Sequence, residues 1–349
     1  MRYVRLGKTD LEVSAIAFGT WSFGGDWGTF DADEAKKTVG RALDLGITFF
    51  DTAQAYGFGA SERLLADALW SRVGRDRVVV ATKGGLRKEG NTLHRDASAR
   101  WLREGVEASL RNLRTDYIDL YQVHWPDPKT PAEDTGRVLA DLVREGKIRH
   151  AGVSNYSPQQ MTELAQYGPV ETDQPPYHMF HRDIEAEILP YTAKNDIGVL
   201  VYGPLAHGLL SGTMTPQTTF AADDWRGSSA DFKGERFARD LELVERLKQY
   251  AAAHEITLPQ LAIAWTMSNP AVDVAIAGAR HPAHLGDPVA AADIGLSASD
   301  RDEIDAILAN AVEIVGPAPE AMPSQRLLSL ARVVWVVPSR GGSRRPDST

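Results

Sequence analysis

Short apolar runs that alternate with longer amphipathic stretches are the feature of this chain that most limits its fold. Eight runs are rich in β-branched residues and are bounded by Gly, Asp or Asn, as buried parallel strands are. They lie at residues 15–18, 47–50, 78–81, 117–123, 148–153, 171–173, 199–202 and 274–277. Helical periodicity follows the first four, at residues 33–45, 61–70, 97–113 and 132–145, and further helices are expected after the others. Repeated βα units of this kind indicate an open doubly wound sheet or a closed barrel.

The number of strands favours the barrel. No G-x-G-x-x-G turn follows the first strand, so the doubly wound dinucleotide-binding fold lacks its usual signature. A length of 349 residues suits one (β/α)8 TIM barrel, and we predict that residues 1–320 form it. Residues 2–14 predict a β-hairpin that plugs the bottom of the barrel. The long polar stretch at residues 213–240 predicts an excursion over the active-site face.

The C-terminal segment differs from the rest in composition. Residues 321–349 end in a basic stretch rich in Ser, Gly, Arg and Pro, which predicts a disordered tail. Its apolar part, LLSLARVVWVVP, is interrupted by Arg332 and is too short to span a bilayer.

Composition and charge exclude several classes of function. The formal net charge of −9 disfavours nucleic acids and anionic membranes as partners. The chain has no cysteine, which excludes disulfides, thiolate metal sites and a cysteine nucleophile. No signal-peptide core stands at the N-terminus and no apolar run has membrane-spanning length, so we expect a soluble cytoplasmic protein of unknown oligomeric state.

Four polar residues with complementary chemistry follow adjacent strands. Asp51 ends the second run, Tyr56 lies in the loop after it, Lys83 ends the third run and His124 the fourth. Each of them alone has an ordinary structural explanation, as a cap, a packing residue, a surface charge or a buried histidine. Together they lie on the rim where parallel barrels hold their active sites.

This combination suits the reduction of a carbonyl group by hydride, which needs a proton donor for the developing oxyanion. A free tyrosine has a pKa near ~10, and a neighbouring ammonium lowers it by favouring the phenolate. Asp51 keeps Lys83 charged and oriented, and His124 can hydrogen-bond the carbonyl oxygen. No H-x-H motif or second carboxylate cluster follows the strands, so we predict no metal site and disfavour a metal-dependent barrel hydrolase.

Several segments resemble the aldo-keto reductase superfamily, and especially its bacterial general reductases. They include FDTAQAYGFGASERLL, VVVATKGG, DYIDLYQVHWPD, Gly152–Asn155, Tyr202–Leu210, Ile276–Arg280 and, for the bacterial members, DDWRGSSADFKGE. The resemblance covers residues 3–322. It implies a TIM barrel that reduces small-molecule carbonyl substrates with NADPH, and it identifies Asp51, Tyr56, Lys83 and His124 as the catalytic tetrad. Potassium-channel β subunits belong to the same superfamily, so an NADPH-binding sensor is the alternative function.

The resemblance also assigns the residues that bind NADPH or NADP⁺. Ser154, Asn155 and Gln174 match the residues that hold the nicotinamide carboxamide, and Tyr202 matches the aromatic residue stacked beneath the ring. Arg280 is placed to bind the 2′-phosphate. The full cofactor set is Gly19, Thr20, Trp21, Ser154, Asn155, Gln174, Tyr202, Pro204, Leu205, Gly208, Leu210, Gly278, Ala279 and Arg280.

Two regions depart from the family or give only weak signals. Many relatives carry Gln and Asn at the positions of His284 and Pro288, where they contact the adenine end. Here Gly286-Asp287-Pro288 predicts a helix break, which weakens the match at that end. The substrate pocket is predicted to be aromatic, lined by Trp21, Trp27 and Trp125, and to favour carbonyl compounds with apolar groups.

Overall fold

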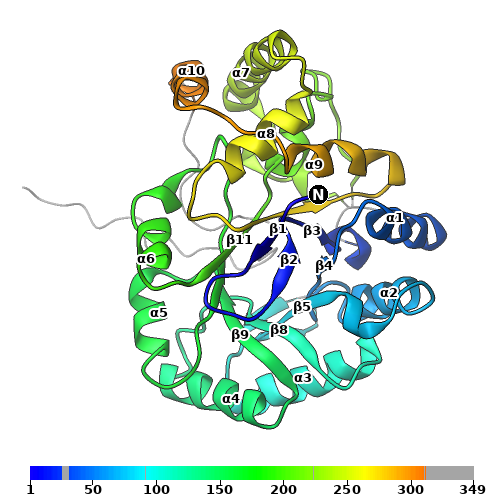
Figure 1. Ribbon diagram of the computed structural model, residues 1–349, viewed down its shortest axis with the longest axis vertical. Helices are drawn as coiled ribbons and strands as arrows, with labels where there is room; N and C mark the ends of the chain where they lie inside the picture. The colour runs from blue at the N-terminus through cyan, green and yellow to red at the C-terminus, as the bar shows by residue number, and fades with distance from the viewer. Residues whose placement is uncertain (26–30, 91, 223, 310, 312–349) are drawn as a thin grey trace, which may run out of the picture.

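The computed structural model describes residues 1–25, 31–90, 92–222, 224–309 and 311, and its centre is a closed eight-stranded parallel barrel (Figure 1). The predicted (β/α)8 fold is therefore confirmed. The strands follow one another around the barrel in the order β10-β11-β12-β3-β4-β5-β8-β9. Their bounds are β3 Ile16–Gly19, β4 Phe49–Asp51, β5 Val79–Gly84, β8 Ile118–Val123, β9 Ile148–Ser154, β10 Thr172–Gln174, β11 Gly198–Tyr202 and β12 Val274–Gly278.

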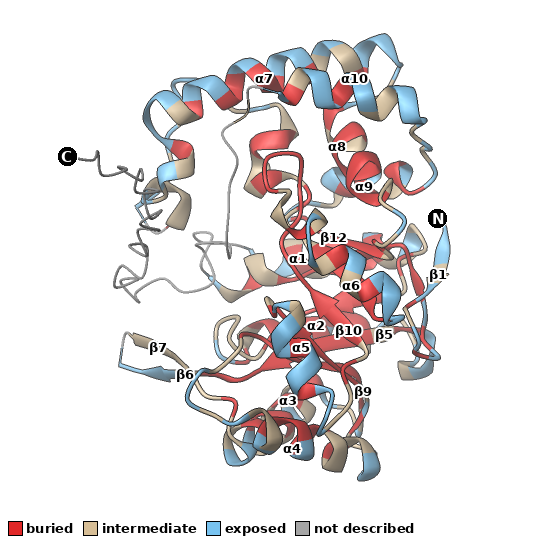
Figure 2. Ribbon diagram, turned by 90° about the vertical axis from the view of Figure 1, so that its left-hand side faces the viewer, coloured by how far each residue is buried: buried red, intermediate tan, exposed pale blue. Residues whose placement is uncertain are grey.

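Helices surround the barrel, and the successive helices α1 to α6 pack one against the next, as do α7, α8 and α9 (Figure 1). Their apolar faces meet the strands, so the buried residues gather in the centre of the molecule (Figure 2). Helix α7 lies farther out and packs against α8 and α10. The helices are α1 Ala32–Asp44, α2 Ala60–Leu69, α3 Ala99–Leu113, α4 Ala132–Arg144, α5 Pro158–Leu164, α6 Ile188–Lys194, α7 Gly234–Ala253, α8 Leu258–Met267, α9 Gly286–Ala291 and α10 Ala298–Leu308.

The predicted N-terminal hairpin is present and closes one end of the barrel. Strands β1 (Tyr3–Arg5) and β2 (Glu12–Ser14) pair antiparallel. Leu6 and Leu11 of this hairpin are buried in one cluster with inward-facing strand residues such as Phe49 and Leu200. The turn approaches β11 so closely that a Cβ on Gly7 would lie 2.2 Å from the backbone nitrogen of Gly198. The plug leaves only the opposite end of the barrel, where the strands have their carboxyl ends, for a site.

Side-chain caps fix where several helices begin. The Asp31 carboxylate accepts the backbone N–H groups of Asp33 and Glu34 at the start of α1. Ser157 begins α5 with a capping box completed by Gln160, and Thr257 begins α8 in the same way. Each cap satisfies backbone donors that have no partner within the helix. Because Ser157 is the cap of α5, Ser154 and Asn155 are not needed for that purpose.

Three features differ from the sequence-based expectations. A second hairpin was missed, in which β6 (Leu86–Glu89) pairs antiparallel with β7 (Thr92–Arg95) and projects from the barrel (Figure 2). The predicted excursion at 213–240 is too long, because α7 already begins at Gly234. The helix break predicted at Gly286-Asp287-Pro288 is wrong, since these residues form the first turn of α9, where a proline needs no hydrogen-bonded N–H. The predicted tail at 321–349 lies outside the described residues.

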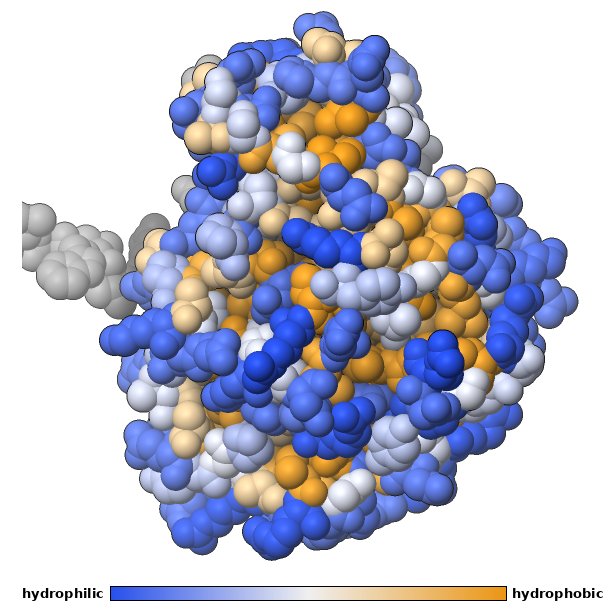
Figure 3. Space-filling model, in the orientation of Figure 1, coloured by the Kyte–Doolittle hydropathy of each residue, from blue (hydrophilic) through white to orange (hydrophobic). Residues whose placement is uncertain are grey.

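The face of the molecule around the N-terminal hairpin is mainly polar (Figure 3). Figure 3 shows hydrophilic residues over most of the face that carries the N-terminal hairpin, with hydrophobic residues gathered in the grooves between them. Within the described ranges, no helix combines the length and the apolar character needed to cross a lipid bilayer.

Candidate active site

The four predicted catalytic residues meet at the open end of the barrel. Asp51 is the last residue of β4, Lys83 lies near the end of β5, His124 follows β8, and Tyr56 lies in the loop after β4. The Lys83 ammonium donates to Asp51 Oδ1 at 2.6 Å and to the carbonyl oxygen of Thr52 at 3.0 Å. Asp51 and Lys83 are only 2% and 1% exposed. The ion pair is therefore shielded from water, which strengthens its effect on neighbouring charges.

Tyr56 lies close to both the lysine and the histidine. Lys83 Nζ is 5.2 Å from the centre of the Tyr56 ring. The His124 ring meets the Tyr56 ring edge-on, with 5.8 Å between their centroids. A phenol close to both an ammonium and an imidazole is suited to proton transfer at a point that both groups can reach.

Burial changes the acid–base properties of both neighbours of Tyr56. Burial lowers the pKa of Lys83, while the Asp51 carboxylate opposes this shift and favours the ammonium. Burial also lowers the pKa of His124 well below its usual value, and the charge of Lys83 lowers it further. His124 is therefore a neutral imidazole at pH 7, and its Nδ1 has no hydrogen-bond partner among the described residues. A neutral histidine in this position can offer an N–H to a ligand without adding a charge.

The residues predicted to hold the nicotinamide form one network with the tetrad. Gln174 Nε2 donates to Asp51 Oδ2 at 3.0 Å, and the Ser154 hydroxyl donates to the backbone carbonyl of Gln174 at 2.7 Å. Asn155 Nδ2 donates to the backbone carbonyl of His124, and its Oδ1 accepts the Tyr202 hydroxyl at 2.9 Å. Asn155 has a φ of +63°, a left-handed conformation that turns its side chain back toward the barrel. Amide and hydroxyl groups are thus fixed beside the acid–base residues.

A cavity of about 1270 Å³ runs from the tetrad across the open end of the barrel. One end is formed by Tyr56, His124 and the β6–β7 hairpin, and the other by the turn after β12 and by His284 and Pro288 of the next segment. The predicted residues that line it are Gly19, Trp21, Asp51, Tyr56, His124, Ser154, Asn155, Gln174, Tyr202, Pro204, Leu205, Gly208, Gly278, Ala279 and Arg280.

A few of the predicted residues are not on the cavity wall. Thr20, Lys83 and Leu210 are buried behind it. Trp125 is 2% exposed and lies under the guanidinium of Arg95, which is 4.9 Å from its ring centre, so it does not line the cavity. Trp27 lies outside the described residues.

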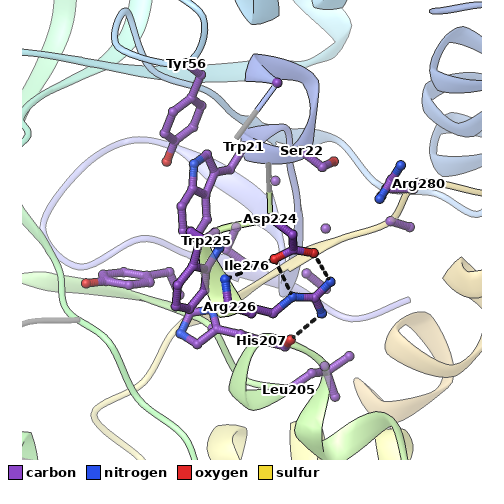
Figure 4. Close-up of a pocket in the computed structure, with 18 of the residues that line it drawn as sticks. Trp21, Ser22, Tyr56, Leu205, His207, Asp224, Trp225, Arg226, Ile276 and Arg280 are labelled. Atoms are coloured by element: carbon purple, nitrogen blue, oxygen red, sulfur yellow. Dashed lines mark hydrogen bonds and ion pairs between the residues drawn. The ribbon is translucent and has the colours of Figure 1, made fainter. Parts of the chain in front are cut away.

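The excursion before α7 supplies a cover that the sequence did not predict in detail. Trp225 stacks on Trp21, with ring centroids 6.1 Å apart and planes at 19°, and Trp21 stacks in turn on Tyr56 (Figure 4). Arg226 donates to both carboxylate oxygens of Asp224 and to the backbone carbonyl of His207 (Figure 4). These contacts fasten residues 224–226, which we call the cover segment, to the loop after β11. The cover segment and the loop that carries Trp21, which are far apart in sequence, thus enclose the cavity between them.

The loop under the cover segment depends on glycine. Gly208 has a φ of +99°, and a Cβ there would lie 3.3 Å from Arg226 Nη1 and 3.2 Å from Met214 Cε. A side chain at this position would strain the backbone and press on the Arg226 guanidinium. The glycine therefore allows the loop and the cover segment to approach closely.

Comparison with known proteins gives one consistent result. Residues 15–309 match the family model described as the aldo/keto reductase family. The chain is 42% identical to the aldo-keto reductase YhdN of Bacillus subtilis over 328 residues, covering 93% of this chain and 99% of the relative. It is 35% identical to the NADH-specific methylglyoxal reductase of Escherichia coli, covering 86% and 96%. The structure of the glycerol dehydrogenase AKR11B4 from Gluconobacter oxydans is similar, with a TM-score of 0.82, 38% identity, and coverage of 90% of this chain and 98% of that one.

Proposed function

Because this chain belongs to the aldo/keto reductase family, we propose that it is an NADPH-dependent reductase that converts aldehydes and ketones to alcohols, with Tyr56 as the proton donor. One observation carries the proposal. The buried Asp51–Lys83 ion pair and the neutral His124 flank Tyr56 at the wall of a cavity large enough for a cofactor and a substrate.

The residues present suit a nicotinamide dinucleotide. The cavity exceeds the range of roughly 300–1,000 Å³ usual for drug-sized ligands, which leaves room for a dinucleotide and a small second molecule. Asn155 and Gln174 can match the donor and acceptor of a carboxamide, and the Tyr202 ring offers a flat surface for stacking. Arg280 lines the opposite end and supplies a cation for a 2′-phosphate. When bound, the cofactor supplies the hydride that reaches the carbonyl carbon.

The protein's own residues would then handle the proton and the charge. His124 would hydrogen-bond the carbonyl oxygen and orient it, which costs no charge because the imidazole is neutral. The Tyr56 hydroxyl would give its proton to the same oxygen as negative charge develops there. Two of the three Lys83 N–H groups are held by Asp51 and Thr52, so the third can support the phenolate that remains. In alcohol oxidation the same groups would work in reverse.

The outer end of the cavity indicates the kind of substrate. Phe58, Leu86 and Leu93 supply an apolar wall there, and Phe58 is one of the few large apolar side chains that are well exposed. Lys88, on the β6–β7 hairpin, has its ammonium 5.6 Å from the centre of the Phe58 ring and forms no ion pair with any described residue. We expect carbonyl compounds with an apolar body to be accepted, and an anionic group at their far end to be favoured by Lys88.

The test is an assay of NADPH absorbance with aromatic and aliphatic aldehydes, ketones and sugars, repeated with NADH. The proposal predicts turnover of reactive aromatic aldehydes with NADPH, and tighter binding of NADPH than of NADH. Tight NADPH binding without turnover of any compound would favour an NADPH-binding regulator instead. That alternative rests on the superfamily resemblance, and one 34% identical relative is named a probable voltage-gated potassium channel subunit beta of Arabidopsis thaliana. Failure to bind either dinucleotide would contradict both functions.

A further inference from the structure

Three buried hydroxyl groups form a closed chain beneath the Asp51–Lys83 pair. The Ser61 hydroxyl lies 2.8 Å from Thr20 Oγ1 and 3.1 Å from Thr52 Oγ1. The Thr20 hydroxyl in turn donates to the backbone carbonyl of Asp51 at 3.1 Å. All three residues are 0% exposed.

The direction of donation in this chain follows from counting protons. The single Ser61 proton is directed at Thr20, where the hydroxyl at 2.8 Å is a nearer acceptor than the backbone carbonyl at 3.0 Å. The Thr52 hydroxyl is then the donor in its contact with Ser61. The order is therefore Thr52 to Ser61 to Thr20 to the carbonyl of Asp51. Because Thr52 follows Asp51 directly, the chain begins and ends on one peptide unit. Each hydroxyl that donates while it accepts polarises the next, so such a chain is stiffer than separate bonds.

The two residues joined by this peptide unit supply both acceptors of the Lys83 ammonium. Asp51 contributes its carboxylate and Thr52 its backbone carbonyl. Ser61 also reaches the loop of the proton donor, because its backbone N–H donates to the carbonyl of Tyr56 at 3.2 Å. One residue at the start of α2 thus joins the end of β3, the end of β4 and the Tyr56 loop.

We propose that the Thr52–Ser61–Thr20 hydroxyl chain is a positioning device for proton transfer, which sets the place of Lys83 relative to Tyr56. This rests on the proposed reductase function. None of the three hydroxyls reaches the cavity wall, so they act through Lys83 and not on substrate. Loss of these hydroxyls should therefore change the rate of proton transfer and leave the binding of cofactor and substrate unchanged.

The first test compares variants that remove a hydroxyl with variants that keep it. Ser61→Ala and Thr20→Val should each lower kcat about 10-fold, in line with the sensitivity of catalysis to small misplacements. The KM for the aldehyde and the Kd for NADPH should stay within about twofold, since Thr20 and Ser61 both lie behind the cavity wall, Thr20 in spite of its predicted place in the cofactor set. Thr20→Ser keeps the hydroxyl and should restore most of the rate. Thr135→Val is the matched control, because the buried Thr135 hydroxyl donates to Ala97 on the outside of the barrel. It should leave kcat unchanged.

The second test asks whether the effect runs through Lys83. In a Lys83→Met background, Ser61→Ala should cause no further loss of kcat in single-turnover reduction, because the group that it positions is gone. Additive losses would contradict the proposal, as would equal losses in Thr20→Ser and Thr20→Val. If Ser61→Ala does not fold, the two Thr20 variants decide the question. A wild-type protein that reduces no carbonyl compound would refute the reductase function, whereas an active wild type with an unaffected Ser61→Ala variant would refute only this inference.

Discussion

Replacing Lys83 by methionine tests the electrostatic part of the account. Methionine fills a similar volume without a charge, so it removes the ammonium and leaves packing around the ring of Tyr56 largely intact. We expect carbonyl reduction to slow strongly, while NADPH binding stays nearly unchanged, because Lys83 does not line the cavity.

The size of the loss follows from the distance between the two groups. At 5.2 Å from the Tyr56 ring and with an effective dielectric constant of about 20, a unit charge interacts with the ammonium by about 3 kcal/mol. If half of that charge has developed in the transition state, the rate falls about 10-fold, and if all of it has, about 200-fold. Asp51 keeps its hydrogen bond from Gln174, but breaking a buried pair still costs stability, on the order of 3–5 kcal/mol.

The assay is single-turnover reduction of an aromatic aldehyde, with NADPH affinity measured by fluorescence and stability by thermal unfolding. Arg75→Met is the matched control. It breaks a second ion pair of the same 2.6 Å length, to the buried Asp119, which keeps a bond from Arg149 just as Asp51 keeps one from Gln174. The control should lose stability without losing kcat. A Lys83→Met variant with near-wild-type kcat, or an equal loss of kcat in the control, would refute the electrostatic argument.

Three further outcomes are expected. Arg280→Ala should raise the Kd for NADPH about 10- to 100-fold, because it removes a charge-assisted bond to the 2′-phosphate, and should leave the Kd for NADH within about threefold. Equal affinities of the wild type for the two cofactors would contradict the assignment of Arg280. Burial raises the pKa of Asp173 to about 8 in the folded protein. Between about pH 4 and that value the folded protein keeps this carboxyl protonated, whereas the unfolded chain has released the proton. The wild type should therefore lose stability as pH rises from about 4 to 8, whereas Asp173→Asn, which has no such proton, should not. The free energy of unfolding of the variant minus that of the wild type should grow over this range and then level off. Parallel pH profiles would show that Asp173 is ionised throughout. Lys88→Glu should lower kcat/KM for para-carboxybenzaldehyde about 3- to 10-fold and leave benzaldehyde unaffected, and a uniform change for both would show that Lys88 does not sense the substrate's charge.

The parallel strands of the barrel were largely predictable because each is a short and mostly buried apolar run. All eight begin within two residues of the predicted positions, including the weakest, at Thr172–Gln174, and only β5 ends as many as three residues away from its prediction. The four residues of the proposed tetrad followed from the rule that the carboxyl ends of such strands share one rim. The start of α9 was misjudged because a Gly-Asp-Pro sequence disrupts the interior of a helix but is compatible with its first turn.

Other features depend on contacts that the order of residues does not reveal. The β6–β7 hairpin had a local signal, since Gly90-Asn91 is a dipeptide typical of two-residue hairpin turns, but its polar strands gave no buried face to recognise. The stacking of Trp225 on Trp21 joins segments about two hundred residues apart and needs the closed barrel to exist first. The same is true of the hydroxyl chain through Ser61, whose three members look in sequence like ordinary turn and cap residues.

The most direct test of the central claim is the reduction of a reactive aromatic aldehyde by Tyr56→Phe, with NADPH affinity measured in parallel. The substitution removes one phenolic oxygen and keeps the ring that stacks on Trp21. We expect kcat to fall by ~10²- to 10⁴-fold, the usual contribution of a general acid, while the Kd for NADPH stays within about twofold. Near-wild-type turnover by Tyr56→Phe would show that the proton comes from another group and would contradict the account.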